Sequence, residues 1–403
     1  MSDEITFSLS ALIDKESRKV IFAEADSDLV DILFSFLTLP LGRILMVLNR
    51  QNGKKAPVIG SLTTLHKGLF PFFQHYHEWR DTKGDHTLAA EYKLKLRVGY
   101  TMPRTNMINN SSNRPRCADL AMDDPFADDG GFTVKSARFR ITDDLKIEPF
   151  LPGTVLQSLI DVGITETHQA ELRTLTLGYN EIIDLLEGSL LSKTPLTDLI
   201  LRNERCIRDS FMCLEKISLQ VEHEVKERNP SESSMTVKAM IQKSTNKIVF
   251  VEAGCDFVNF LSEFLFSTLG CVERALGNNT GLHCIDSLYR SISNIDGDKY
   301  FKNKYDDDEC IEMKPILLNA SSFFRFPYGT RVVKQNSIYN VTDDLTVTPF
   351  NITSSFSILS RLKIPLSDVD EVDLVVGHDE ALRILKASLT STSALTDALI
   401  NSI

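Results

Sequence analysis

Two pairs of adjacent aspartates are the residues of this sequence best suited to acid–base or metal chemistry. Asp143-Asp144 and Asp343-Asp344 each stand in a Thr-Asp-Asp-Leu segment. Paired carboxylates bind hard cations or transfer protons. In a turn, however, Asp side chains accept hydrogen bonds from nearby backbone amides. Because adjacent residues of a strand point to opposite faces, we favour the turn over a shared catalytic site.

A second candidate for chemistry is the histidine-rich stretch between residues 60 and 87. It contains His66, His75, His77 and His86, with acidic residues interleaved. Histidines and carboxylates are zinc ligands, but no recognised ligand spacing is completed here. The alternative is that these histidines contact water or aromatic neighbours. The sequence leaves open whether this stretch binds metal.

Glu24 and Glu252 each follow an apolar strand and precede a helix. A carboxylate near a helix N-terminus is favoured by the helix dipole, and a catalytic role would need a convergent partner. The sequence contains no Gly-x-Ser-x-Gly, no P-loop, no complete dinucleotide fingerprint and no His-Glu-x-x-His. We therefore assign no catalytic, cofactor-binding or metal-ligating residue, and we expect no cofactor.

The elements that position these residues occur twice. Glu24 aligns with Glu252, 228 residues apart (252 − 24), within an ungapped window of matching residues. The two Thr-Asp-Asp-Leu segments align 200 residues apart (343 − 143), so the first copy carries an insert at about 63–131. We infer an internal duplication, because repeats of this kind decide the fold. The predicted domains are a first repeat at 1–201, a charged linker with a helical pattern at 202–234, and a second repeat at 235–403.

Each repeat reads as strands mixed with helices. Alternating apolar residues predict a hairpin over residues 9–23, and helical spacing predicts a helix from about residue 26 that ends near Pro40 and Gly42. Gly270 is expected to end the equivalent helix in the second repeat. A second hairpin around Thr-Asp-Asp-Leu, a short helix, a strand and a last helix follow. The predicted class is α+β, with two tandem copies of one domain, each with antiparallel hairpins packed on helices in a β-grasp-like arrangement.

Composition restricts partners and location. The net charge of −11 argues against nucleic-acid binding. The apolar run 29–48 contains Asp31 and Arg43, so we expect no membrane span. Seven scattered cysteines and an acidic start without a signal peptide predict an intracellular protein, cytoplasmic or nuclear and not secreted.

Five segments of the chain resemble a plant family known as domain of unknown function 674. They are Val20–Ala25, Leu37–Gly42, Gly130–Phe132, Ile141–Leu145 and Leu190–Asp198. The resemblance covers most of the chain, and it implies a plant source, tandem copies and no established activity. Family members carry a Cys-x-Cys-Gly-like stretch in the middle segment. Here Cys117 alone remains in that region, which argues against a metal role for it.

Two functional hypotheses follow. The first is a non-enzymatic module that binds another protein or a small ligand, because only packing and turn residues recur between the repeats. It predicts an exposed apolar patch or a free strand edge. The alternative is an enzyme with an active site in the cleft between the two repeats. It predicts a pocket there, with perturbed Asp, Glu or His residues from both halves.

Overall fold

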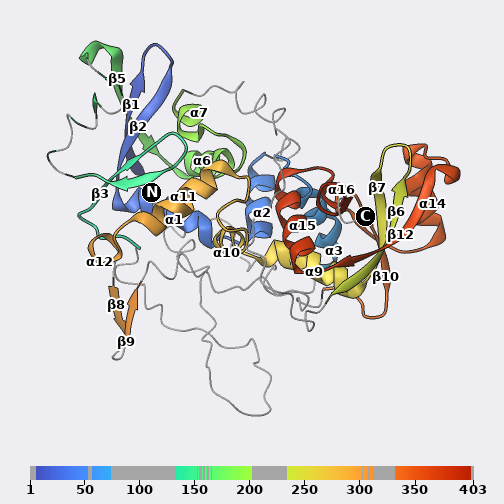
Figure 1. Cartoon of the computed structure of the whole chain (residues 1–403). Coiled ribbons are helices and arrows are strands. Elements are labelled where there is room, and N and C mark those ends of the chain that lie inside the picture. Colours follow the sequence, from blue (N-terminus) through green and yellow to red (C-terminus); the bar gives the residue numbers. More distant parts are fainter. Residues whose placement is uncertain are drawn as a thin grey trace.

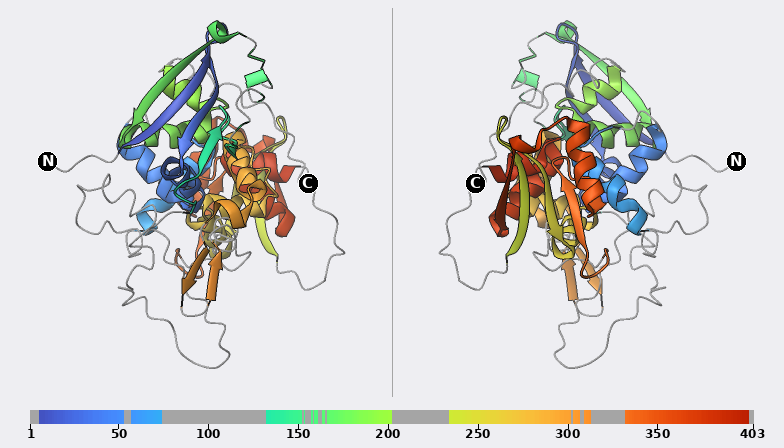
Figure 2. Two further views of the ribbon diagram at one scale, coloured as in Figure 1. Left: turned by 90° about the vertical axis from the view of Figure 1, so that its left-hand side faces the viewer. Right: turned by 90° about the vertical axis from the view of Figure 1, so that its right-hand side faces the viewer.

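The computed structural model describes residues 6–52, 57–73, 132–201 with gaps between 152 and 165, 234–301, 303–306, 309–312 and 332–400. Two five-stranded antiparallel sheets lie at opposite ends of the molecule, with helices between them (Figures 1 and 2). The predicted α+β class is confirmed.

The two sheets have the same strand order. The first sheet has the order β4-β3-β2-β1-β5, with bounds Phe7–Asp14 (β1), Lys19–Asp26 (β2), Arg138–Ile141 (β3), Ile147–Pro149 (β4) and Ala170–Leu177 (β5). The second sheet has the order β11-β10-β7-β6-β12, with bounds Met235–Gln242 (β6), Lys247–Gly254 (β7), Ile338–Thr342 (β10), Val347–Pro349 (β11) and Val369–Val376 (β12). The first hairpin of each sheet has a register shift at the equivalent place, Leu12/Ile13 and Met240/Ile241. Both features are consistent with a duplicated unit.

The strand that returns beside β1 settles the comparison with the β-grasp arrangement. β5 pairs with β1, and β12 with β6, but both pairs are antiparallel. Ubiquitin-like domains pair the corresponding strands in parallel. A parallel pair needs a crossover that leaves both strands running the same way, and here the chain returns in the opposite direction. The β-grasp likeness is therefore wrong in strand direction.

The helices follow the strands in both halves. In the first half they are Ser27–Ser35 (α1), the 3-10 turn Phe36–Thr38 (η1), Leu41–Asn52 (α2), Leu62–Phe73 (α3), Tyr179–Leu191 (α6) and Pro195–Leu201 (α7). In the second half they are Cys255–Phe266 (α9), Leu269–Ala275 (α10), His283–Asn294 (α11), Gly297–Tyr300 (α12), Ile352–Leu362 (α14), His378–Thr390 (α15) and Ala394–Leu399 (α16). Short 3-10 turns, Thr167–Gln169 (η4) and Leu366–Asp368 (η6), precede β5 and β12, and a small hairpin joins Asn303–Asp306 (β8) to Glu309–Glu312 (β9).

The helix boundaries near the middle of the two halves compare differently with the prediction. In the first half, α1 ends at Ser35 and η1 continues it to Thr38, close to the predicted end, while Pro40 forms an isolated antiparallel bridge with Thr268. Gly270 lies inside α10, because α9 has already ended at Phe266. The helix ends lie beside the backbone pairing between the two halves, and local sequence patterns cannot predict that pairing.

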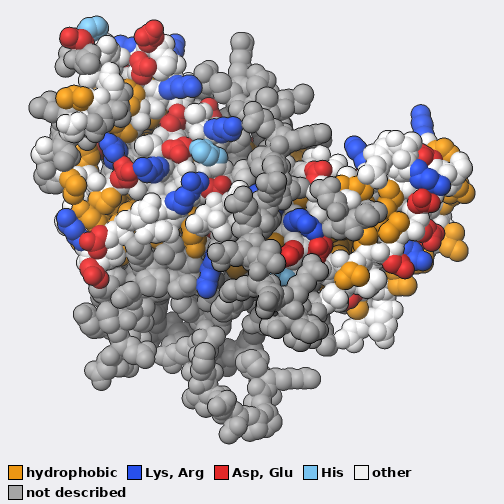
Figure 3. Space-filling model, in the orientation of Figure 1, with side chains coloured by type: hydrophobic (Ala, Val, Ile, Leu, Met, Phe, Trp, Pro, Cys, Tyr) orange, Lys and Arg blue, Asp and Glu red, His pale blue; other side chains and the backbone are white. Residues whose placement is uncertain are grey.

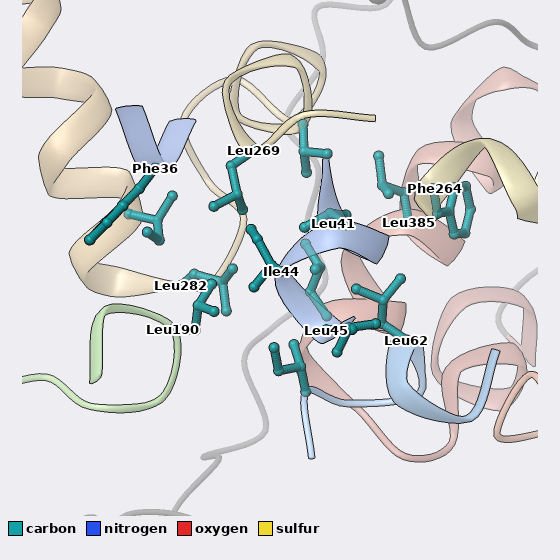
Figure 4. Close-up of a cluster of buried hydrophobic side chains, with 14 of the residues drawn as sticks. Phe36, Leu41, Ile44, Leu45, Leu62, Leu190, Phe264, Leu269, Leu282 and Leu385 are labelled. Carbon is teal, nitrogen blue, oxygen red and sulfur yellow. The ribbon is translucent and has the colours of Figure 1, made fainter. Parts of the chain in front are cut away.

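One apolar core runs through both halves. Its members include Phe36, Leu41 and Leu62 from the first half and Phe264 and Leu269 from the second (Figure 4). The inner faces of both sheets border this core, as the alternating burial of β1 shows. Among the described residues, no helix has the length and apolar character needed to cross a lipid bilayer.

The third helix of each half packs on the other half. α3 contacts α9 and β11, whereas α11 contacts α1, α6 and β4. Residues 63–73, which we assigned to the insert, lie in α3. The rest of the insert and residues 202–233 of the linker lie outside the described residues.

Candidate functional site

A cavity of about 360 Å³ opens beside the Thr-Asp-Asp-Leu turn of the second half. Small-molecule sites in proteins occupy roughly 300–1,000 Å³ and combine apolar walls with a few polar groups. The apolar lining comes from Ile248, Val249, Leu362 and Ile364. The polar lining comes from Gln242, Lys247, Thr342, Asp343, Asp344, Arg361, Thr392 and Ser393. The cavity therefore has the size and the mixed character of a small-ligand site.

Asp343 is the carboxyl group that the fold holds most firmly in this cavity. Its Oδ1 accepts a hydrogen bond of 2.7 Å from the backbone N–H of Thr396, at the start of α16. Burial raises the pKa of Asp343 to about 6, although hydrogen bonds from Thr396 and Ser393 oppose the rise. The carboxyl group thus changes its charge close to neutral pH at the wall of a cavity.

The Asp343 network also explains why two short motifs recur in the sequence. The backbone N–H of Ile248, at the start of β7, donates to Thr396 Oγ1 at 2.9 Å. Thr396 therefore joins the first hairpin to the Thr-Asp-Asp-Leu turn, through its hydroxyl on one side and its backbone on the other. The Thr-Asp-Asp-Leu and Leu-Thr-Asp segments recur together because they bond to each other.

The first half contains the same network. Thr197 donates from its backbone N–H to Asp143 Oδ1 at 2.8 Å and from its hydroxyl to Asp143 Oδ2 at 2.6 Å. The N–H of Val20 donates to Thr197 Oγ1 at 2.8 Å. Burial raises the pKa of Asp143, against the effect of these hydrogen bonds. The N-terminus of α7 receives this carboxylate from a turn more than fifty residues away.

Asp144 bonds in a different direction, towards the other half. Its Oδ1 accepts from Thr142 Oγ1 at 2.5 Å, and its Oδ2 accepts from Ser287 Oγ on α11 at 3.0 Å. His283 Nε2 lies 3.6 Å from the same oxygen. Burial raises the pKa of Asp144, but the hydrogen bonds from Thr142 and Ser287 and the nearby His283 outweigh burial and lower it. The paired aspartates therefore carry separate structural contacts, which agrees with the turn interpretation.

His66 is a buried residue of α3. Burial, and next the charge of Lys67, lower the pKa of His66 to about 4. Its ring lies 5.6 Å from that of Phe70, in a tilted arrangement. His75, His77 and His86 lie outside the described residues. Among the residues that are described, no three His, Cys, Asp or Glu side chains gather in a way that could hold a metal ion.

Glu24 and Glu252 lie on strands, away from the helix ends. Glu24 pairs with Arg140 across β2 and β3, and the N-cap of α1 is Asp26, which accepts a hydrogen bond from the N–H of Leu29 at 3.1 Å. Glu252 stands between like and opposite charges on its sheet. Burial and a neighbouring glutamate raise its pKa, and a neighbouring lysine lowers it. The expected contact with a helix N-terminus is therefore wrong for both glutamates.

A buried polar cluster lies between α10, α11 and α15, and it was not predicted from the sequence. Glu273 is fully buried, and its Oε1 accepts from Thr280 Oγ1 at 3.0 Å, while its Oε2 has no hydrogen-bond partner among the described residues. Thr280 Oγ1 also lies 2.7 Å from Asp286 Oδ1, and Glu273 is hydrogen-bonded to Asp286. Lys386 is buried nearby and donates to Asn279 Oδ1 at 3.0 Å. Burial, and next the Asp286 carboxyl group, therefore raise the pKa of Glu273 well above its ordinary value.

The repeat alignment contains a signal for this cluster. The 228-residue offset places Leu45 opposite Glu273, and the offset of the last helices places Glu187 opposite Lys386. An apolar core position in one half is therefore a carboxyl group in the other. A search for charged residues aligned with core leucines would have found it.

Exposed apolar side chains gather around α14. Ile352 and Phe356 are 83% and 61% exposed, and Leu366, just beyond the helix, is 69% exposed. Figure 3 shows hydrophobic surface at this end of the molecule, over the second sheet and α14. Among the described strands, β12 pairs with β6 alone and so lies at an edge of the same sheet. Both surface features that the binding hypothesis predicts are therefore present.

Together these features define an α+β protein of two like sheets with a mixed polar and apolar cavity in its second half. The sequence profile of a family described as "Protein of unknown function (DUF674)" matches residues 3–77, 101–324 and 313–378. The chain belongs to this family, as its sequence resemblance predicts. No curated protein and no solved structure matches the chain.

Proposed function

We propose that the protein is a non-enzymatic binding module of plant cells, built from two tandem copies of one unit, and that the cavity beside Asp343 holds a small ligand. The observation that carries this proposal is the cavity of about 360 Å³ with apolar walls and both signs of charge around it. Such a site can enclose an apolar group and orient one polar group. The net charge of −11 argues against nucleic acid as the partner.

The contacts of the motif carboxylates support binding over catalysis. Asp143, Asp144 and Asp343 each accept hydrogen bonds that join one element to another. A catalytic carboxylate must instead reach a substrate atom. The enzyme alternative places its site between the repeats, whereas buried side chains such as Leu41 and Leu269 fill that region and the cavity lies within the second half.

An intracellular location, in the cytoplasm or nucleus and without secretion, is part of the proposal. Among the described residues, Cys255 and Cys284 are thiols that form no disulfide. Unpaired thiols are typical of reducing compartments. The exposed apolar side chains of α14 favour a protein as a second type of partner, next to the cavity.

A fragment screen by ligand-detected NMR on the full chain tests the small-ligand proposal. Thr392 is exposed and lines the cavity, so Thr392→Trp should fill it. Lys193 stands at the equivalent place in the first half, and Lys193→Trp is the matched control. We expect fragments whose binding is lost in Thr392→Trp and kept in Lys193→Trp. Hits that respond equally to both variants, or a screen without hits, would contradict a ligand site here.

A further inference from the structure

The exchanged helices α3 and α11 raise the question of whether the two halves are separate domains. Each sheet is built entirely from its own half. The helix that completes the packing against each sheet comes from the other half, because α3 contacts β11 and α11 contacts β4. An independent domain has its own core and few contacts across its boundary. Here the contacts cross the boundary in both directions.

Hydrogen bonds fix α11 to the first half. Ser291 Oγ accepts from the backbone N–H of Ile147 at 2.8 Å. Cys284 Sγ donates to the carbonyl of Ser192 at 3.1 Å. Together with the bond from Ser287 to the Asp-Asp turn, these contacts occupy one face of α11, since residues three and four apart share a helix face. The first half therefore recognises α11 by a specific polar pattern as well as by apolar packing.

The reciprocal contacts of α3 reach the equivalent loops of the second half. Ser61 Oγ donates to the carbonyl of Ser391 at 2.7 Å. Thr64 Oγ1 donates to the carbonyl of Asp344, in the Asp-Asp turn. Gly68 lies against the backbone of Val347, where a Cβ atom would come within 3.1 Å of the nitrogen. α3 thus uses the same face and the same three loops as α11 does in the first half.

A short backbone pairing lies where the halves meet. Pro40 and Thr268, which are equivalent residues, form an antiparallel bridge with each other. The N–H of Leu41 donates to the carbonyl of Ser267 at 2.9 Å, and the N–H of Leu269 donates to the carbonyl of Leu39 at 3.2 Å. Each of these bonds becomes the other when the halves are interchanged. An isologous interface, in which equivalent residues meet at a twofold axis, has this pattern.

We infer that the two halves are the subunits of a pseudo-dimer, in which each half is the binding partner of the other. The surface formed by α1, α6 and β4 accepts α11, and the surface formed by α9 and β11 accepts α3. The halves hold their folds only while these helices are exchanged, and the linker at 202–233 serves as a tether that association does not need. This inference rests on the contacts between the halves and is independent of the proposed ligand site.

Cleavage of the full chain in its linker tests the inference. A site for a sequence-specific protease is placed within residues 202–233, and the purified protein is cut and passed over a sizing column with mass detection. We expect the fragments to stay together at the mass of the intact chain, 45.3 kDa. We also expect the melting temperature of the cut protein to fall on dilution, while that of the uncut protein stays constant, because separation has become bimolecular. Two folded fragments that elute apart would overturn the inference.

A pair of core variants makes the test specific to the exchanged helix. Leu288 lies on the face of α11 that bonds to the first half, whereas Met240 belongs to a separate apolar cluster formed only by second-half residues. In the cut protein, Leu288→Ala should weaken association at least tenfold, and Met240→Ala should leave it within about twofold. Equal effects of the two variants on association would show that α11 does not hold the halves together.

Discussion

The buried carboxyl group of Glu273 makes stability depend on pH in a direction that the structure determines. Burial, and next the Asp286 carboxyl group, hold the pKa of Glu273 well above its ordinary value of 4.5. The folded protein therefore keeps a proton that the unfolded chain releases. The resulting stabilisation is fully present below pH 4.5 and is lost as the pH rises towards the raised pKa. The charge of Arg290 opposes this rise only in part.

Glu273→Gln keeps the shape of the side chain but binds no proton, so it should remove this dependence. Linkage sets the slope at up to about 1.4 kcal/mol per pH unit between pH 4.5 and the raised pKa. The free energy of unfolding of the variant should therefore rise relative to that of the natural chain as the pH rises above 4.5. Urea unfolding followed by circular dichroism at half-unit steps of pH measures both curves. The comparison between two curves cancels the titration of every other group.

A glutamate on the surface provides the control. The side chain of Glu16, in the turn between β1 and β2, is exposed, so Glu16→Gln should leave the pH profile unchanged. If the profile of Glu273→Gln runs parallel to that of the natural chain at all pH values above 4.5, the folded protein does not hold the extra proton at Glu273 and the reasoning is refuted.

Three further predictions use the same unfolding assay. His66→Tyr should make the protein less sensitive to acid. The lowered pKa of about 4 makes the natural chain lose about 3 kcal/mol of its free energy of unfolding as the pH falls from 6.5 to 4. Equal acid midpoints of the two proteins would contradict this. Thr396→Ala removes the hydroxyl that bonds to Ile248 and Asp343 and should lower the free energy of unfolding by about 1–2 kcal/mol. The double variant with Asp343→Ala should lose less than the sum of the two single losses. Additive losses would show that the pair is not coupled. Gly60→Ala should destabilise the protein more than Gly153→Ala. Both glycines have positive φ, but only at Gly60 would the new Cβ lie 2.5 Å from a carbonyl oxygen of α15. Similar losses of stability in the two variants would rule out that clash.

Much of the fold follows from local patterns in the sequence. The alternation of β1 and the helical spacing of α1 report which side of each element is apolar, and the structure buries those sides. The hairpin around Asp143 was predictable because turn chemistry is local. These elements needed no knowledge of their neighbours.

The exchange of α3 and α11 was beyond this reasoning for a physical reason. A periodic apolar face shows that a helix is buried but not which surface buries it. The alignment offset also changes between α1 and α3, from 228 to 223, so the match between Leu65 and Leu288 fell outside the ungapped window. The bond between Asp143 and Thr197 was missed because its two ends lie more than fifty residues apart.

The candidate site was predictable in its residues but not in its role. Asp343 stood out as half of a carboxylate pair, and the structure gives it a cavity on one side and a helix to cap on the other. The remaining lining groups come from β6, β7, β10, the Asp-Asp turn, α14 and the loops that follow α14 and α15. Sequence spacing cannot bring such groups together, because their approach depends on how α14 lies across the sheet.

The two halves have similar residues where they contact each other and different residues where we expect a specific activity. The Thr-Asp-Asp-Leu turn bonds to its own last helix and to the exchanged helix of the other half, and Thr197 links it to its own first hairpin. A change in the turn would therefore disturb all three connections. By contrast, Arg361 at the cavity aligns with Asp161, and Glu273 aligns with Leu45. Residues at the interface between the halves must match on both sides of a pseudo-twofold axis, whereas a ligand site needs to be present in only one half. We therefore expect a specific function at the cavity or at the buried cluster of the second half, where the sequences of the two halves differ.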